Sequence, residues 1–203
     1  MQKSTIDDIL ERLKILETEL ETEIDQLLSE KRELFRYTLD KGKVQFEHGI
    51  KVLQRHQRTG LLKYIFAAHL GHLLIAPIIY SVFIPLVMLD IMATVYQQIC
   101  FRVYGIPLVV RRKYIVIDRQ HLAFLNLIEK LNCTYCGYSN GLIEYVREIA
   151  AKTEQYWCPI KHAQRTPDPH KQVNHFIDYG DADNYKARIR ELRNEIRNLK
   201  EQR

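Results

Sequence analysis

One long apolar stretch limits what this chain can fold into more than any other feature. It runs from Leu61 to Phe101, and between Tyr64 and Phe101 it contains a single formally charged residue, Asp90. The stretch has about 41 residues, whereas one helix across the hydrocarbon of a bilayer needs roughly 20. The sequence therefore predicts a membrane-bound protein with soluble, charged segments on either side of this stretch.

Two prolines near the middle of the stretch, Pro77 and Pro85, predict how it is arranged. Each proline removes a helix hydrogen bond and disfavours helix in the residue before it. We therefore expect a membrane-embedded helical hairpin in residues 61–104, descending over about 62–79 and returning over about 82–101. The alternatives are a single kinked span from Leu73 to Gln97 and a buried helix of a soluble core.

Basic residues flank the apolar stretch on both sides and predict its orientation. They are Lys51, Arg55 and Arg58 before the stretch, Lys63 at its beginning, and Arg102, Arg111, Arg112, Lys113 and Arg119 after it. Because an excess of Lys and Arg marks the cytoplasmic side of short loops, we expect both termini on the cytoplasmic face of a membrane. A net charge of +5 also suits a bilayer containing anionic lipid. Nucleic acid is disfavoured as a partner, since the basic residues cluster beside the membrane stretch.

The segment before the membrane stretch predicts a coiled-coil helix over residues 1–40 and a basic juxtamembrane linker over residues 41–60. The helix is predicted from apolar residues that recur at steps of three and four. They are Ile6, Ile9, Leu13, Leu16, Leu20, Ile24, Leu27 and Leu34, with Lys31 in the same series. We expect this helix to serve assembly, in a homo-oligomer or as part of a membrane complex.

Three ionisable residues lie inside the stretch itself. His69 and His72 are three residues apart and share one helix face, and a hairpin that turned near Ser81 would bring Asp90 to the depth of His72. Ionisable groups at membrane depth usually face a partner, a cavity or a pathway. His69, His72 and Asp90 are therefore a candidate intramembrane polar site, either as a hydrogen-bonded pair or as a metal or proton site.

Residues 105–165 predict a small cytoplasmic domain built around a metal knuckle. We expect a short strand at about Tyr114 to Ile117, a helix from about Arg119 to Leu131, and a second helix from Ser139 or Asn140. The cysteines lie between and after these two helices. This arrangement predicts a turn at residues 133–138, where metal ligands could converge.

The candidate metal ligands are Cys133, Cys136, Cys158 and His162. The run from Cys133 to Tyr138 is similar to a zinc knuckle, a local motif in which the small residue after the second cysteine lets backbone amides turn toward the thiolates. Three thiolates and one imidazole form a tetrahedral zinc set. Alternatives are iron or an iron–sulfur cluster, a dithiol redox pair, or free cysteines. His170 or His175 could replace His162 as the fourth ligand.

Residues 166–203 predict an irregular segment followed by a C-terminal amphipathic helix. Its apolar residues are Ile189, Leu192, Ile196 and Leu199. Because an amphipathic helix needs a partner for its apolar face, we expect this helix to contact the N-terminal helix, within one chain or across an oligomer.

The fold class expected from the sequence is mainly α, with a membrane segment, two coiled-coil-like terminal helices and a Cys/His metal-knuckle domain. The function that this combination favours is a membrane-anchored structural or assembly protein with a structural zinc site on the cytoplasmic side. The alternative is a redox or metal-dependent membrane enzyme that uses the cysteine site or the His69, His72 and Asp90 group. The sequence assigns no catalytic residue.

Overall fold

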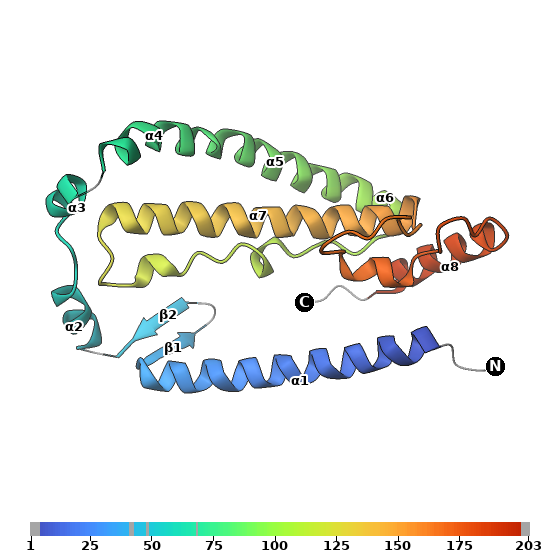
Figure 1. Cartoon of the computed structure of the whole chain (residues 1–203), viewed down its shortest axis with the longest axis horizontal. Coiled ribbons are helices and arrows are strands. Elements are labelled where there is room, and N and C mark those ends of the chain that lie inside the picture. The colour runs from blue at the N-terminus through green and yellow to red at the C-terminus, as the bar shows by residue number, and fades with distance from the viewer. Residues whose placement is uncertain (1–4, 41–42, 48, 68, 200–203) are drawn as a thin grey trace. The chain divides into compact units, whose positions relative to one another are not determined.

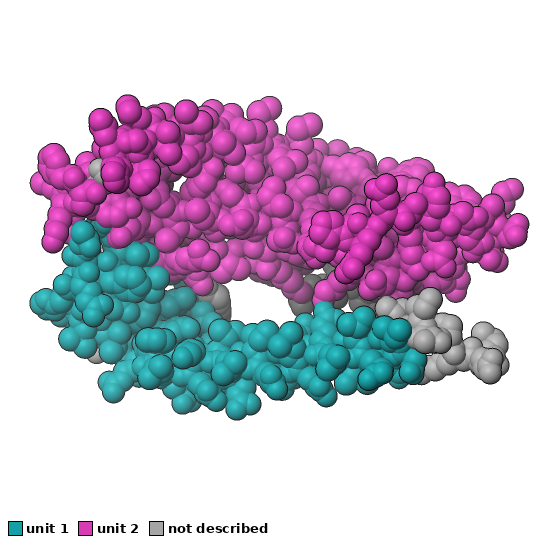
Figure 2. All heavy atoms as spheres, viewed as in Figure 1, with its two compact units in different colours: residues 1–59, 121–126 teal, residues 60–120, 127–203 magenta. Residues whose placement is uncertain are grey.

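The computed structural model describes residues 5–40, 43–47, 49–67 and 69–199, and the side chains of Thr5, Ile6, Asp7 and Leu10 lie outside this description. The predicted mainly α fold is confirmed, since helices dominate the element order. The chain divides into two compact units (Figure 2). Unit 1 contains residues 1–59 and 121–126, and unit 2 contains residues 60–120 and 127–203.

Unit 1 begins with the long helix α1 (Thr5–Leu34), as the spacing of its apolar residues predicts. Lys31 and Arg32 lie in its last turn, where positive charge is favourable beside the free carbonyl groups. The helix ends where Arg36 adopts a left-handed backbone conformation with φ of 51°. The predicted seam is solvent-exposed in the described residues, with Ile9, Leu16 and Leu34 at 52%, 60% and 65% exposure.

The rest of unit 1 contains a short β-hairpin and one short helix. Strands β1 (Tyr37–Asp40) and β2 (Lys43–Phe46) pair antiparallel, with Tyr37 opposite Phe46 and Asp40 opposite Lys43. The Tyr37 and Phe46 rings lie 5.7 Å apart, which adds a cross-strand aromatic contact. Helix α2 (Ile50–His56) follows Gly49.

Unit 2 begins with α3 (Leu61–Ala67), and the rest of the apolar stretch is one continuous helix rather than a hairpin. α4 (Leu70–Ser81), α5 (Phe83–Tyr96), the π-helical turn η1 (Gln97–Phe101) and α6 (Arg102–Tyr104) follow each other without a reversal. Together they form a 35-residue helix from Leu70 to Tyr104. The predicted reversal near Ser81 is therefore wrong.

The prolines explain why the helix continues. Pro77 lies inside α4, where a proline removes one hydrogen bond and can kink the helix without reversing the chain. Pro85 lies in the first turn of α5, where its missing N–H costs little. Val82 keeps helical dihedral angles at the junction, and the backbone N–H of Leu86 donates to its carbonyl at 3.3 Å.

After this helix the chain returns beside it and then runs parallel to it as α7 (Figure 1). Gly105 ends α6 in a left-handed conformation with φ of 73°, and Ile106 N donates to the carbonyl of Phe101 at 2.8 Å. The return segment, residues 106–120, contains the short 3₁₀ turn η2 (Arg111–Lys113), and a second turn, η3 (Arg119–His121), lies at its end. The predicted strand from Tyr114 to Ile117 is not formed, because these residues pass along α7 without pairing.

Helix α7 (Leu127–Trp157) continues through the region predicted as a metal knuckle. Its buried residues Tyr138, Leu142, Tyr145 and Ile149 follow steps of four, three and four, so one apolar face begins directly after the two cysteines. The two predicted helices are therefore one, and no turn separates them. Gly141 permits close packing here, since a Cβ at this position would lie 2.5 Å from the Tyr114 carbonyl oxygen.

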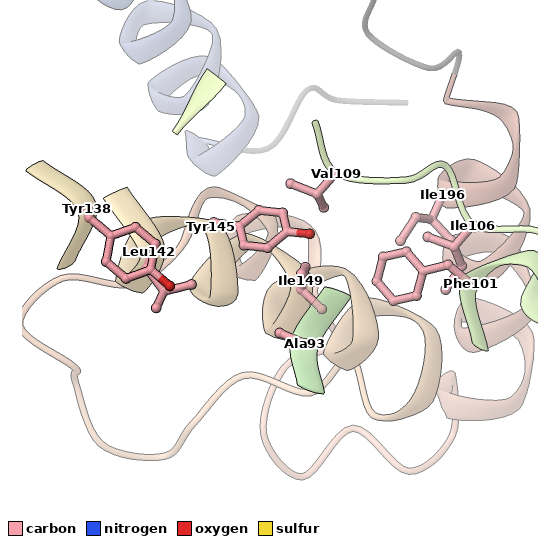
Figure 3. Packing of buried hydrophobic residues seen from close by; sticks show 9 residues of the cluster. All are labelled: Ala93, Phe101, Ile106, Val109, Tyr138, Leu142, Tyr145, Ile149 and Ile196. Carbon is pink, nitrogen blue, oxygen red and sulfur yellow. The ribbon is translucent and has the colours of Figure 1, made fainter. Parts of the chain in front are cut away.

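The core of unit 2 forms where the two long helices, the return segment and the last helix meet (Figure 3). Tyr145, Leu142 and Phe101 are fully buried side chains in this cluster. Val109 and Ile106 of the return segment pack into it, and Ile196 joins from the C-terminal helix. The apolar stretch thus buries one side of α5 and η1 against α7, while many side chains on its other side are exposed.

The C-terminal part of unit 2 contains η4 (Lys171–His175) and α8 (Tyr185–Asn198). The predicted C-terminal seam exists, but it already has a partner within its own unit. Ile189 and Leu192 pack with Ile177, and Ile196 packs into the main core. This burial removes the reason for the predicted pairing of the terminal helices, because α8 needs no further cover for these three side chains.

Candidate functional site

The most polar buried group in unit 2 is centred on Asp90 of α5. Arg111 donates from Nε to Asp90 Oδ1 at 3.0 Å and from Nη2 to Oδ2 at 2.5 Å. Tyr138 of α7 donates its hydroxyl to Asp90 Oδ2 at 2.9 Å. The Asp90 residue is only 9% exposed, so this paired geometry replaces most of the water that a carboxylate would otherwise bind.

A second polar group lies two turns further along the same helix. The side-chain amide of Gln97 accepts from Val109 N at 2.9 Å and donates to the Val109 carbonyl at 3.3 Å, so it pairs with this backbone as a strand would. Gln97 also hydrogen-bonds the Tyr145 hydroxyl, which lies within 3.3 Å of the Thr94 hydroxyl. Gln97 begins the π-helical turn η1, a feature that often accompanies functional positions in helices.

These two groups fix the return segment between the long helices. Arg111 and Val109 are both held by side chains of the apolar helix, and both contacts involve a tyrosine of α7. Burial, together with the neighbouring Asp90 carboxylate, raises the pKa of the Tyr138 hydroxyl. Tyr138 therefore remains a donor to Asp90 at neutral pH, and the arrangement is that of a satisfied structural network.

A groove of about 560 Å³ opens on the other side of the return segment. It lies between residues 107–114, one face of α7 and residues 168–172, with Leu199 at its edge. The lining carries both signs of charge. The basic residues are Lys113, Arg147, Lys152, His170 and Lys171, and the acidic residues are Glu144, Glu148 and Asp168.

Lys152 is the most unusual residue of this groove. Its Nζ donates to the Pro107 carbonyl at 3.3 Å. Burial lowers the pKa of the Lys152 ammonium, and the nearby Glu148 carboxylate opposes this effect. An amine with a lowered pKa is a better nucleophile and proton acceptor at neutral pH than an exposed lysine.

The outer wall of the groove is held to α7 by polar contacts. Arg147 pairs with Asp168 at 2.9 Å, and Gln172 donates to Glu148 at 3.1 Å. His170 Nε2 lies 2.8 Å from Glu154 Oε2. The groove therefore has a defined wall, and its cationic and anionic groups are arranged largely in pairs.

The four candidate metal ligands are not brought together within this chain. Cys133 and Cys136 lie near the beginning of α7, and Cys158 follows its last residue. The 22 residues from Cys136 to Cys158 correspond to about 33 Å of helix, far beyond the reach of two thiolates on one ion. Within residues 5–40, 43–47, 49–67 and 69–199, no three His, Cys, Asp or Glu side chains are grouped to hold a metal ion. Gly137 does not form a knuckle turn, since it lies inside the helix.

The predicted intramembrane group is separated as well. The rings of His69 and His72 lie 5.9 Å apart, and both residues are exposed. Asp90 lies on the same continuous helix, 18 residues after His72, which corresponds to about 27 Å along the axis. Asp90 is therefore the only one of the three predicted residues that takes part in the polar network described above.

Sequence reasoning missed the residues that partner Asp90 and Gln97. A lone charge in an apolar stretch predicts a partner of opposite charge, and Arg111 was available among the basic residues that follow. The contribution of Tyr138 and Tyr145 could have been found from the apolar face of α7, which begins directly after the C-x-x-C motif. Lys152 had no signal in the sequence, because its burial depends on the return segment.

Comparison with known proteins places this chain in no group. No family model, no curated protein and no solved structure matches it.

Proposed function

We propose that this protein is a membrane-anchored structural or assembly protein whose apolar helix lies along a bilayer surface. The observation that carries the proposal is the helix from Leu70 to Tyr104, which is long and apolar enough to cross a membrane. Its most apolar window has a mean hydropathy of 2.2 and is 0% buried. An exposed apolar surface of this extent marks a membrane or protein contact.

The packing of unit 2 favours a helix in the membrane plane over one that crosses the bilayer. α7 lies beside the apolar helix, as shown by contacts from Tyr80 with Asn132 to Tyr96 with Thr153. A crossing helix would take α7 and the return segment into the hydrocarbon, including Arg111 and Lys152. Charged groups at that depth are costly. Lying in the interface buries only the exposed apolar side, as in monotopic proteins.

Charge at both ends of the helix supports contact with anionic lipid. Lys63 precedes the helix and Arg102 lies near its end, and both are exposed. Basic residues beside a membrane-contacting surface are attracted by anionic headgroups, with about 1 kcal/mol for each Lys or Arg near the surface. Both termini would then lie on the same side of the bilayer.

The test is flotation of the full chain with vesicles of phosphatidylcholine and phosphatidylserine. We expect the wild-type chain to float with the vesicles, and the double variant Ile84→Asp, Met92→Asp to lose about tenfold or more of the bound fraction. Ile84 and Met92 are 65% and 67% exposed on α5. The matched control is Leu127→Asp, at 67% exposure on α7, which should bind as the wild type does. Equal flotation of all three chains would contradict the proposal.

Protease treatment of the vesicle-bound chain separates the two orientations. A helix in the membrane plane leaves both termini accessible from outside, whereas a crossing helix protects one of them. Protection of either terminus in sealed vesicles would contradict the in-plane arrangement.

The groove around Lys152 supports a second candidate function, the binding of a small polar molecule. The supporting observations are a defined cavity of about 560 Å³ and a partly buried amine whose pKa is lowered by desolvation. Pockets with convergent polar groups and a perturbed ionisable residue are typical of ligand sites. A screen of small carboxylates and phosphates by thermal shift, with Lys152→Met as the control, tests this candidate.

A further inference from the structure

The apolar seam of α1 is an exposed surface of unit 1 in the described residues. We define the α1 seam as Ile9, Leu13, Leu16, Leu20, Ile24, Leu27, Lys31 and Leu34. Its apolar members are between 45% and 65% exposed. A helix with an uncovered apolar face is marginal in water, since most helix stability comes from burying that face. The α1 seam therefore needs a partner.

The spacing of the seam is the same in both chain directions. From Ile9 to Lys31 the steps are four, three, four, four, three and four, which form a palindrome about Leu20. From this symmetry and the charges below, we propose that α1 pairs antiparallel with α1 of a second copy of the chain, with the two-fold axis at Leu20. Leu13 then packs against Leu27 of the second copy, and Leu16 against its Ile24.

Charge favours the antiparallel orientation over the parallel one. A parallel dimer places Lys31 in the seam directly against Lys31 of the second copy, and a buried pair of like charges is costly. The antiparallel dimer places Lys31 against Ile9, near the acidic first turns that contain Asp8 and Glu11. It also brings Arg12 beside Glu30 of the second copy, at positions that flank the seam and set orientation in coiled coils.

The acidic middle of α1 does not distinguish the two orientations. Glu17, Glu19, Glu21 and Glu23 surround Leu20, so acidic residues lie opposite acidic residues of the second copy in either arrangement. They limit the strength of the dimer and predict that moderate salt strengthens it, because salt screens like charges at an exposed surface. The orientation is decided at the ends of the helix.

The inference rests on the assembly role in the proposed function, and it identifies the partner as a second copy of the chain. Each α1 helix is about 45 Å long. In an antiparallel pair, the C-terminal ends of the two copies of α1 therefore lie at opposite ends of the pair. Each membrane unit would then be attached at its own end of the pair. Vesicle flotation can succeed while this pairing fails, so the two proposals are separable.

The test is disulfide formation between full-length chains in mild detergent. We expect a mixture of Leu13→Cys and Leu27→Cys chains to form a disulfide between positions 13 and 27, identified by mass spectrometry of the linked peptides. Leu20→Cys alone should form a self-linked dimer and serves as the positive control. The wild-type chain, treated in the same way, identifies any disulfide from the four native cysteines.

A link from Leu13→Cys to itself, without the 13-to-27 link, would establish a parallel dimer and overturn the inference. A second measurement does not depend on disulfides. Leu20→Glu should weaken dimerisation on the order of a hundredfold in sedimentation equilibrium, because it places two charges at the two-fold axis. Thr22→Glu adds the same charge on the opposite side of α1 and should leave the dimer within about threefold. A wild-type chain that remains monomeric would also overturn the inference.

Discussion

Arg111 holds Asp90 through two hydrogen bonds, of 3.0 Å and 2.5 Å, and so pairs the one formal charge between Tyr64 and Phe101 with a residue 21 positions later. The side chain of Asp90 is 12% exposed and that of Arg111 is 45% exposed. The two partners are therefore unequal, since Arg111 keeps partial access to water and Asp90 does not. Loss of Arg111 should cost more than loss of Asp90.

The low exposure of Asp90 gives the first prediction. Arg111→Ala should lower the free energy of unfolding of unit 2 by about 2–4 kcal/mol, because it leaves a buried carboxylate without its charged partner. Arg112→Ala is the matched control, since Arg112 is exposed and adjacent, and its effect should stay within about 0.5 kcal/mol. Denaturant unfolding followed by circular dichroism measures both. Equal effects of the two substitutions would show that the ion pair adds nothing.

The second prediction concerns the close contact at Gly141. A Cβ at this position would lie 2.5 Å from the Tyr114 carbonyl oxygen and 2.8 Å from Ile115 Cα, and both are backbone atoms. Gly141→Ala should therefore destabilise unit 2 by about 1–3 kcal/mol, even though alanine is the better helix former by about 1 kcal/mol.

Gly71 provides the control for this prediction. It lies in α4, and a Cβ there would have no atom within 4 Å. Gly71→Ala should be neutral or stabilise the protein by up to about 1 kcal/mol. Thermal unfolding of both variants in the same detergent compares their stabilities with that of the wild type and tests this prediction. A stabilised Gly141→Ala chain would mean that the return segment does not pack on α7 as described.

The sequence predicted the helical class, the presence of α1 and the apolar seam of α8, but it extended the first helix to residue 40, whereas α1 ends at Leu34 and β1 follows. These succeeded because each depends on a local repeat of apolar residues. The hairpin failed because Pro77 and Pro85 were read as breaks. A proline in the first turn or a single one in the interior leaves the chain direction unchanged, and no local signal near Ser81 distinguishes a kink from a reversal.

The candidate metal ligands are not grouped in the described residues, for a different reason. Cysteine and histidine spacing predicts ligands only if the chain turns between them, and the apolar face of α7 prevents a turn. Tyr138, Leu142 and Tyr145 form that face directly after the C-x-x-C motif, and the helix is already continuous from Leu127. The small residue after Cys136, Gly137, suggested a knuckle turn, whereas Gly137 and Gly141 permit the close approach of residues 114–116. That approach is a tertiary contact and could not be predicted from the helix sequence alone.

The third prediction follows from the position of the cysteines. The double variant Cys133→Ser, Cys136→Ser should retain the helical circular dichroism of the wild-type chain, with a change in unfolding free energy of about 1 kcal/mol or less. Cys136 is exposed and Cys133 is half-buried, so neither substitution leaves a large cavity. Addition of a chelator should not change the unfolding curve. Loss of helix in either experiment would indicate a structural metal site, as in proteins whose folding depends on zinc.

The last prediction concerns the pH dependence that Lys152 contributes. Burial lowers its pKa from the ordinary 10.5, so between the lowered value and 10.5 the unfolded chain binds more protons than the folded one. Stability contributed by this residue therefore rises with pH across that interval, and the cost of burying the charged amine is fully present below it. Lys152→Met removes the titrating group while keeping most of the apolar stem, so the variant should lose this rise in stability with pH and be neutral or stabilised at neutral pH.

Unfolding by denaturant at several pH values from 7 to 10 measures how the stability of each chain changes with pH. Lys186→Met, at an exposed position of α8, is the matched control and should follow the wild type. Parallel curves for the wild type and Lys152→Met would show that the amine is not buried in the groove.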